Sequence, residues 1–344
     1  MQDFTWLTPY LLLNLSHGLL GLIWLGGLRR WTGSLPAILE ASLLRWLLAL
    51  PAIALILRSL GLTTATPAGP VLIRIDDWSK IINQSELALG ALLSLSAGAA
   101  LVTFIQEILP LLKKMYPNIS KNRQRLEVTQ NSRPHLALEN ITRSYFKSSS
   151  TGAITDRSIT RSWSPHAWTW KVRTRAPKVI VSTDLWIATE GLFFPQIIIS
   201  TAVLSLLNDD ELEASIAHEC AHLAIGSNFV LGWIWLIRLV QLFNPAALVA
   251  FRELVECREL ACDSWASWIT RKPEALASAI KKLTDANYVT LAQSSRDTHA
   301  ARAEIRTTAQ RIQALLETDV TAPDSAIFLI FSTALLGGLL WGIR

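Results

Sequence analysis

The chain has 344 residues and a formal net charge of +5, with 51% hydrophobic and only 17% charged residues. Its mean hydropathy of +0.32 excludes an ordinary soluble protein, and its 14 tryptophans suit the interfaces of a membrane. The three cysteines, Cys220, Cys257 and Cys262, lack the spacing of a disulfide framework, so we expect that part of the protein to lie in a reducing compartment.

Four apolar stretches are long enough to cross a bilayer as helices. The first, residues 9–28, is followed by Arg29-Arg30. Because the charges follow the apolar residues, a retained span is favoured over a cleaved signal peptide. The other stretches are residues 36–57, 87–112 and 325–343. The sequence therefore predicts an N-terminal membrane domain with three spans over residues 1–112 and a C-terminal transmembrane span over residues 325–344.

The distribution of positive charge predicts the orientation of these spans. Arg29, Arg30 and the basic stretch that begins at Lys113 are expected inside, and the N-terminus and the loop of residues 58–86 outside. Residues 113–324 then lie inside, and the last span returns the C-terminus to the outside. We expect a multi-pass protein of the bacterial plasma (inner) membrane with its polar part in the cytoplasm.

The segment of residues 113–177 is polar and strongly basic. From Lys113 to Lys178 there are 14 lysines and arginines against three acidic residues. Its weak periodicity predicts a basic cytoplasmic linker with some short structure. Contact with anionic lipid explains the charge better than nucleic acid does, because no nucleic-acid motif accompanies it. His166 has either a structural role here or a place near a functional site.

A second domain is predicted over residues 178–324, and it opens with β-strands. Residues 179–181 and 190–199 are rich in β-branched and aromatic side chains and are interrupted by Gly191 and Pro195. Such a strand belongs either to the core of a sheet or to its edge, where an extended peptide can pair with it.

A helix is predicted to begin after Asn208. The Asn208 side chain can cap it, and Glu211 stands where a capping box requires an acidic partner. Asp209 and Asp210 add negative charge at the positive end of the helix dipole. Apolar residues then recur at helical spacing, at Leu212, Ile216 and Leu223.

This helix contains an H-E-x-x-H motif, His218-Glu219-Cys220-Ala221-His222. Two histidines four residues apart lie on one helical face, where they can bind a zinc ion, and Glu219 is close enough to act on a water there. The alternative is an amphipathic helix with two incidental histidines. Because the whole chain has only six histidines, the motif is a rare chance event, and the metal interpretation is favoured.

Residues 229–251 are very apolar but include Arg238 near their middle. A further membrane span would leave this charge in lipid. It would also place His222 and the next candidate ligands on opposite sides of the membrane. A buried or membrane-surface helix hairpin is therefore favoured over a span.

Asn244-Pro245 is typical of a helix start, with a capping asparagine and a proline at the first helical position. On this helix Arg252, Glu256, Glu259 and Asp263 form one polar stripe. Beyond two histidines a zinc site needs one more protein ligand, which Glu259 or Glu256 can supply. Asp263, one turn beyond Glu259, suits an acceptor for the other ring N–H of a ligand histidine, which favours Glu259.

Several segments together resemble a known family, the antirepressor-type membrane zinc metallopeptidases to which the beta-lactam sensors and signal transducers belong. The matching segments are Glu190-Gly191-Leu192-Phe193-Phe194-Pro195, Asp210-Glu211-Leu212, the H-E-x-x-H motif, Asn244-Pro245, Glu259-Leu260-Ala261-Cys262-Asp263 and Arg311-Ile312-Gln313-Ala314-Leu315-Leu316. The resemblance covers roughly residues 178–318, and the layout of three spans plus one agrees with it.

The resemblance implies an α-helical integral membrane protein of about four spans, with an α+β cytoplasmic metallopeptidase domain of the zincin (gluzincin) fold. It implies that one Zn²⁺ per chain is held by His218, His222 and Glu259, that Glu219 is the general base and that Asp263 supports a ligand. Candidates for contacts to the substrate or to the oxyanion are Arg252, Glu256 and His166.

The implied function is endopeptidase cleavage in signal transduction. The substrate would be a cytoplasmic or membrane-proximal protein, such as a transcriptional repressor or the chain itself. The expected partners are this protein or peptide substrate and membrane lipids. A homodimer is an open alternative, and no nucleic acid is expected.

The chain departs from the family pattern in two places. Residues 225–228 stand where the family often has Arg-x-Asp, and no extracellular penicillin-binding sensor domain is expected, since the chain ends at Arg344. A heat-shock-type membrane quality-control zinc protease, which shares H-E-x-x-H and E-x-x-x-D, is one alternative. A non-catalytic metal-binding signalling scaffold is another, although the intact Glu219 argues against it.

Overall fold

The structure is a computed structural model of the chain. It describes residues 7–33, 35–60, 75–109, 126–127, 132–150, 178–182, 187–190, 196–225, 228–293 and 298–317. The chain divides into two compact units. Unit 1 comprises residues 1–120, 232–257 and 327–344, and unit 2 comprises residues 121–231 and 258–326. The predicted C-terminal span, His166 and residues 191–195 of the predicted strand lie outside the described residues.

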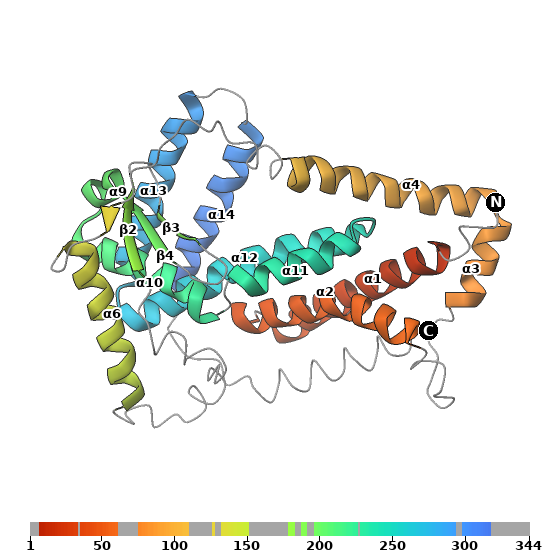
Figure 1. Ribbon diagram of the computed structural model, residues 1–344, viewed down its shortest axis with the longest axis horizontal. Coiled ribbons are helices and arrows are strands. Elements are labelled where there is room, and N and C mark those ends of the chain that lie inside the picture. Colours follow the sequence, from red (N-terminus) through yellow and green to blue (C-terminus); the bar gives the residue numbers. More distant parts are fainter. Residues whose placement is uncertain are drawn as a thin grey trace. The chain divides into compact units, whose positions relative to one another are not determined.

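Unit 1 is built from helices (Figure 1). Its own elements are α1 (Leu7–Thr32), α2 (Ala37–Ser59), α3 (Ile75–Gln84), α4 (Glu86–Thr103) and the π-helix η2 (Phe104–Ile108), to which it adds parts of α11 (Asn228–Val240) and α12 (Pro245–Thr270). Among the described helices, α1 and the stretch Glu86–Gln106 are long and apolar enough to cross a membrane. These two helices support a membrane protein, whereas the four spans and their orientation stay predictions.

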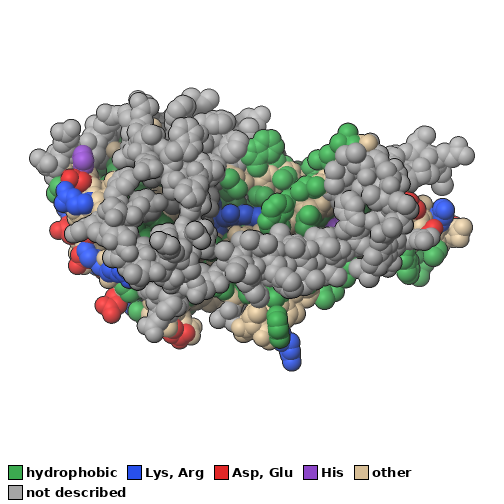
Figure 2. All heavy atoms as spheres, turned by 90° about the horizontal axis from the view of Figure 1, so that it is seen from below, with side chains coloured by type: hydrophobic (Ala, Val, Ile, Leu, Met, Phe, Trp, Pro, Cys, Tyr) green, Lys and Arg blue, Asp and Glu red, His purple; other side chains and the backbone are tan. Residues whose placement is uncertain are grey.

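Two further helices of unit 1 occupy the region between these spans. α2 coincides with the second predicted span and has one proline, Pro51, inside it. α3 lies in the segment predicted as an outer loop. Its Ile75 and Ser79 are buried, while Trp78 and Ile81 are exposed. On the face drawn in Figure 2, hydrophobic side chains gather over the helices of unit 1, and charged side chains gather mainly over unit 2.

Unit 2 contains a four-stranded mixed sheet. Its strands are β1 (Leu126–Glu127), β2 (Lys178–Ser182), β3 (Ile187–Glu190) and β4 (Gln196–Ser200), in the order β1-β2-β4-β3. β2 and β4 pair in parallel, and β1 and β3 join them as antiparallel neighbours. β4 is an inner strand whose three isoleucines, Ile197, Ile198 and Ile199, are buried, which explains the unbroken β-branched sequence. Of the two interpretations left open, β4 therefore belongs to the core, and β3 forms one edge of the sheet.

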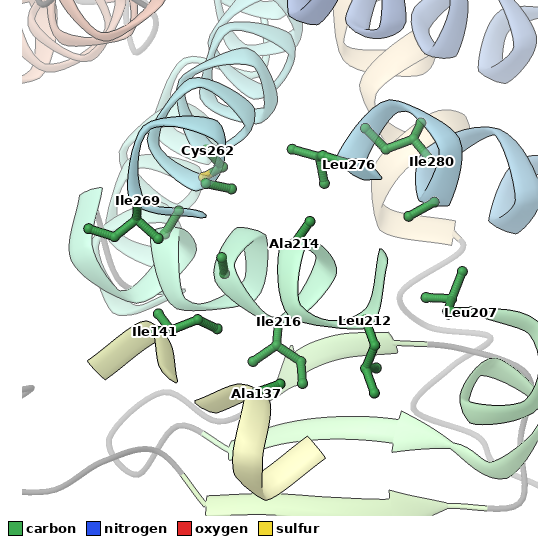
Figure 3. Packing of buried hydrophobic residues seen from close by; sticks show 14 of the residues in the cluster. Ala137, Ile141, Leu207, Leu212, Ala214, Ile216, Cys262, Ile269, Leu276 and Ile280 are labelled. Carbon is green, nitrogen blue, oxygen red and sulfur yellow. The ribbon is translucent and has the colours of Figure 1, made fainter. Parts of the chain in front are cut away.

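Helices pack around α10 (Asp209–Ile225) to form the core of unit 2. In Figure 3, Leu212 and Ile216 of α10 point toward Ala137 and Ile141 of α6 (Arg133–Ser150), and residues of α12 and α13 (Pro273–Gln293) lie across α10. α6 lies in the segment predicted as a linker. Its apolar residues recur at helical spacing within a basic sequence, so this part of the segment is built into the core.

The start of α10 confirms the predicted capping box. The Asn208 side chain accepts a hydrogen bond of 2.8 Å from the Glu211 backbone N–H, and the Glu211 carboxylate accepts one of 2.9 Å from the Asn208 backbone N–H. Glu211 is buried and also accepts hydrogen bonds from Ser278 and Lys282 of α13. The cap thus ties the beginning of α10 to α13 and fixes the direction in which α10 crosses the core.

Candidate metal centre

The two histidines of the motif lie on one face of α10, as their spacing predicts. Their ring centroids are 4.8 Å apart and the rings are nearly perpendicular. His218 is buried and His222 is half-buried. Because α10 is held by its cap and by packing on both sides, the two rings are presented by a well-supported helix.

Glu259 of α12 reaches both histidines. One carboxylate oxygen lies 3.4 Å from His218 Nε2 and the other 3.6 Å from His222 Nε2. Ligand atoms of these three residues all lie within 4.8 Å of one another, and they form the group of potential metal ligands found among the described residues. Glu256, the other sequence candidate, is exposed and is not part of this group.

Asp263 lies behind His218, one helical turn beyond Glu259. Its Oδ1 is 2.8 Å from His218 Nδ1, so the carboxylate can accept the proton of the ring nitrogen that faces away from Glu259. Asp263 is almost fully buried. An acceptor at Nδ1 leaves Nε2 with its lone pair free for a cation, which is the tautomer that metal binding needs.

Arg311 of α14 (Thr298–Glu317) holds Asp263 from the other side. Its Nε and Nη2 each donate a hydrogen bond of 2.7 Å to one of the two Asp263 oxygens, and its Nη1 lies 3.4 Å from Glu259 Oε2. A bidentate arginine–carboxylate pair fixes both distance and orientation. Arg311 therefore connects the residue behind His218 with the carboxylate between the histidines.

Glu219 is buried beside the histidines and is held by the edge strand β3. The Thr189 hydroxyl lies 2.7 Å from Glu219 Oε2 and donates to it. Burial raises the pKa of Glu219, while the charge of His218 and the Thr189 hydroxyl lower it to a smaller extent. A carboxylate with a raised pKa is a stronger base than one on the surface.

Cys262 lies next to the second histidine. Its Sγ is 3.2 Å from His222 Nδ1. Burial and the surrounding carboxylates raise the pKa of this thiol well above its usual value, so it stays neutral. The two histidines therefore differ in the group next to Nδ1, which is the Asp263 carboxylate for His218 and a neutral thiol for His222.

The charges of the group are strongly coupled. Burial alone would lower the pKa of His218, but Asp263 and Glu259 outweigh it and raise that pKa to about 10. Burial and the neighbouring charge of His218 lower the pKa of His222 to about 3. Burial opposes ionisation of Glu259, yet the two histidines and Arg311 hold its pKa well below the usual range.

This donor set fits a metal ion such as zinc. Two imidazoles and one carboxylate converge from two helices, which is the three-ligand arrangement of catalytic zinc sites that keep a fourth position open. A cation would also relieve the cost of placing Glu259 and Asp263 so close together in a buried place. The residues that would hold it are His218, His222 and Glu259.

The sequence candidates are thus only partly brought together. Arg252 and Glu256 are exposed side chains in the part of α12 that belongs to unit 1, and His166 lies outside the described residues. Sequence reasoning assigned no site role to Arg311, Thr189 or Cys262. Arg311 opens the R-I-x-x-L-L segment and Cys262 lies within E-L-A-C-D, so the resemblance contained a signal for both, but Thr189 carried none.

Two histidines from one helix, with a carboxylate from another, define the class of H-E-x-x-H metalloproteins. Comparison with protein families narrows this class. Residues 179–312 match the family described as BlaR1 peptidase M56, so this segment of the chain is similar to that peptidase family. The resemblance predicted from the sequence is thereby confirmed. Comparisons with the curated proteins and with the solved structures found no match.

Proposed function

We propose that the protein is a membrane-embedded zinc-dependent endopeptidase that cleaves a cytoplasmic or membrane-proximal protein in signal transduction. The observation that carries this proposal is the convergence of His218, His222 and Glu259 next to the buried carboxylate of Glu219. The match of residues 179–312 to the BlaR1 peptidase family and the two helices long and apolar enough to span a membrane support a peptidase at a membrane. Catalysis, zinc and the cytoplasmic orientation belong to the proposal.

A zinc ion bound here would polarise a peptide carbonyl and make a water more acidic. Glu219 takes the proton of that water as its oxygen bonds to the carbonyl carbon. Because Thr189 donates to Oε2 of Glu219, we assign Oε1 as the proton acceptor. Glu219 then passes the proton to the amine nitrogen as the C–N bond breaks, which leaves one new carboxyl and one new amino terminus.

The substrate is proposed to bind as an extended segment along β3. Among the described strands β3 is at the edge of the sheet, and it pairs with β4 only through its other side. An edge strand offers backbone groups to an extended peptide. Because Thr189 of β3 also contacts Glu219, a peptide bound along this edge would pass close to the base. A transcriptional repressor, a membrane protein or the basic segment of the chain itself are candidate substrates.

The test is a mass-spectrometric comparison of new protein N-termini in cells that express the wild type, Glu219→Gln or Glu274→Gln. The first change removes the base and leaves the metal ligands, and the second is a matched control on the exposed start of α13. We expect termini that appear with the wild type and with Glu274→Gln but not with Glu219→Gln. Identical sets in all three strains under several envelope stresses would refute the peptidase and favour a metal-binding scaffold.

A further inference from the structure

The segment of unit 1 formed by residues 232–257, which we call the hairpin, has an inverted distribution of side chains. It comprises the end of α11, the turn of residues 241–244 and the first half of α12. The polar residues of its α11 part and of the turn point inward, since Arg238 is only 1% exposed and Gln241 2%, whereas Arg252 and Glu256 near the far end of the segment are exposed. Large apolar residues face outward at helical spacing, with Trp233 53%, Leu236 48% and Val240 51% exposed. This is the reverse of a water-facing amphipathic helix.

The hairpin leaves unit 2 and returns to it. α10 before the hairpin and the second half of α12 after it belong to the same hydrophobic core. A chain that leaves and re-enters one compact core ends on the same side of a membrane. α11 also has only 13 residues, or about 20 Å of helix, against about 30 Å for the hydrocarbon core. The hairpin therefore does not cross the membrane.

The tip of the hairpin is bonded to α1 far from its basic end. The Asn244 side-chain amide donates a hydrogen bond of 2.7 Å to the Asn14 carbonyl, and the Tyr10 hydroxyl donates to the Val240 carbonyl. Asn14 precedes Arg29 by fifteen residues, which corresponds to about 22 Å along the helix.

The other end of the hairpin stays near the basic end of α1. Arg29 donates a hydrogen bond of 2.8 Å to Glu253 and also pairs with Glu40 of α2. Arg29 and Arg30 mark the end of a candidate span, where positive charge stands at the membrane surface. If α1 crosses the bilayer, the hairpin enters at this surface and its tip passes the midplane.

Close packing holds the tip against α1. A Cβ atom on Gly18 would lie 2.7 Å from the Asn244 side-chain nitrogen and 2.9 Å from Ala246 Cβ, so only glycine allows this approach. Gly26, two turns further along α1, has nothing within 4 Å of the same added atom. The absence of a side chain at Gly18 therefore lets the tip pack against α1, and Gly26 serves as a control position on the same helix.

Most of the tip's backbone N–H groups have partners, which an irregular segment inside a membrane needs. The N–H groups of Gln241, Leu242 and Asn244 donate to carbonyls of the preceding turn, and that of Ala246 to the Asn244 side chain. The Gln241 side chain donates a hydrogen bond of 2.6 Å to the Leu48 carbonyl, in the middle of α2. Arg238 lies over the ring of Phe251 and donates to Thr103 at 3.3 Å.

We propose that the hairpin of residues 232–257 is a re-entrant membrane element whose outward face contacts lipid acyl chains. The candidate spans of the same unit likewise expose apolar side chains, such as Ile23 of α1 and Leu101 of α4. Acyl chains match this face because the exposed side chains of α11, Trp233, Leu236 and Val240, are aromatic or aliphatic, while Arg238 and Gln241 donate hydrogen bonds inside the unit. α12 thus begins within the membrane and, further along the same helix, carries Glu259.

The depth of the hairpin is measured by spin labelling of the full-length protein in liposomes. Single cysteines replace Leu236, Val240, Ile23 or Lys281 in a background in which the three native cysteines are serines, and oxygen and nickel–EDDA serve as collision probes. Val240 is expected to show an oxygen-to-nickel ratio at least as high as that of Ile23, above that of Leu236 and several-fold above that of the exposed Lys281 of α13. A surface hairpin would give equal shallow values at Leu236 and Val240, and a hairpin in water would match Lys281. Either result would overturn the proposal.

A pair of glycine variants tests the same inference without relying on depth alone. Gly18→Leu should displace the tip and lower the oxygen-to-nickel ratio at Val240 at least twofold, whereas Gly26→Leu should leave it unchanged. Equal effects of the two changes would contradict the proposal. The measurement needs no peptidase activity, so a failure of the proposed function and a failure of the re-entrant hairpin remain distinguishable.

Discussion

At the scale of single residues, Asp263, which lies behind the candidate ligand His218, is held as specifically as His218 itself. Asp263 is a buried carboxylate that faces His218 on one side and a bidentate arginine on the other. Without Arg311, Asp263 would be left with a buried negative charge and only one partner, which is costly. Asp263 would then shift or take up a proton, and His218 would lose the orientation that metal binding requires.

Replacing Arg311 by alanine should therefore lower zinc affinity about 10–100-fold, the range seen when the partner behind a metal ligand is removed. Arg311→Lys should recover only part of this loss, because an ammonium group cannot bind both oxygens in parallel. Affinity is measured by competition with a chelator, and the visible spectrum of the cobalt-substituted protein reports the ligand geometry. Arg143→Ala, which breaks an exposed pair with Glu139, is the control. Unchanged zinc affinity and an unchanged cobalt spectrum in Arg311→Ala would contradict this role.

Thr189 orients the base. Thr189→Val keeps the shape of the side chain but removes the hydroxyl that donates to Glu219. We expect kcat to fall about 10–150-fold with little change in KM, because a hydrogen bond to a charged group contributes roughly 1.5–3 kcal/mol and each 1.36 kcal/mol is about tenfold in rate. Thr189→Ser should restore most of the rate. The kinetics are measured on the substrate found by comparing N-termini, and an equal loss in both variants would point to a packing role instead.

At the scale of elements, the cap of α10 determines how the helix of the motif is held. Glu211 is buried, and burial alone would raise its pKa, but Lys282, Ser278 and the Asn208 N–H together lower that pKa below its usual value of 4.5. A carboxylate with a lowered folded-state pKa stabilises the fold above about pH 4.5, and this contribution is lost as the pH falls through the folded-state pKa.

Glu211→Gln should accordingly reduce stability at neutral pH by about 1–2 kcal/mol, and the difference from the wild type should shrink as the pH is lowered below about 4.5. Thermal unfolding of the detergent-solubilised protein at several pH values measures this. Asp285→Asn on the exposed face of α13 provides the comparison. A difference that stays constant from pH 7 to pH 3 would show that the charge of Glu211 is not the cause.

At the scale of the whole molecule, a metal bound by both α10 and α12 links two parts of unit 2 that are distant in sequence. Binding to the folded state alone stabilises it by about 2.7 kcal/mol when free zinc is 100 times Kd. We therefore expect chelation to lower the unfolding temperature of the wild type by about 5–10 °C. His222→Ala should lack this shift and His135→Ala in α6 should retain it, as measured by scanning calorimetry with and without added zinc. A shift of equal size in His222→Ala would place the zinc elsewhere.

The features that could be predicted from the sequence are those that depend on near neighbours. The capping box, the helix of the motif and the helix start at Asn244-Pro245 follow from spacings of a few residues, and the structure confirms them. The apolar length of α1 and α4 is likewise a local property. The placement of His218 and His222 was therefore predictable, because their spacing puts both side chains on one helical face.

Tertiary structure decided what depends on packing between distant segments. It singled out Glu259, which the sequence only favoured over Glu256, and it brought Thr189 to Glu219 across 30 residues and Arg311 to Asp263 across 48. It also made β4 an inner strand, built α6 into the core and turned residues 232–257 back along α1. Helical periodicity specifies which face of an element is apolar, but only the packing of elements determines which residues from different segments meet.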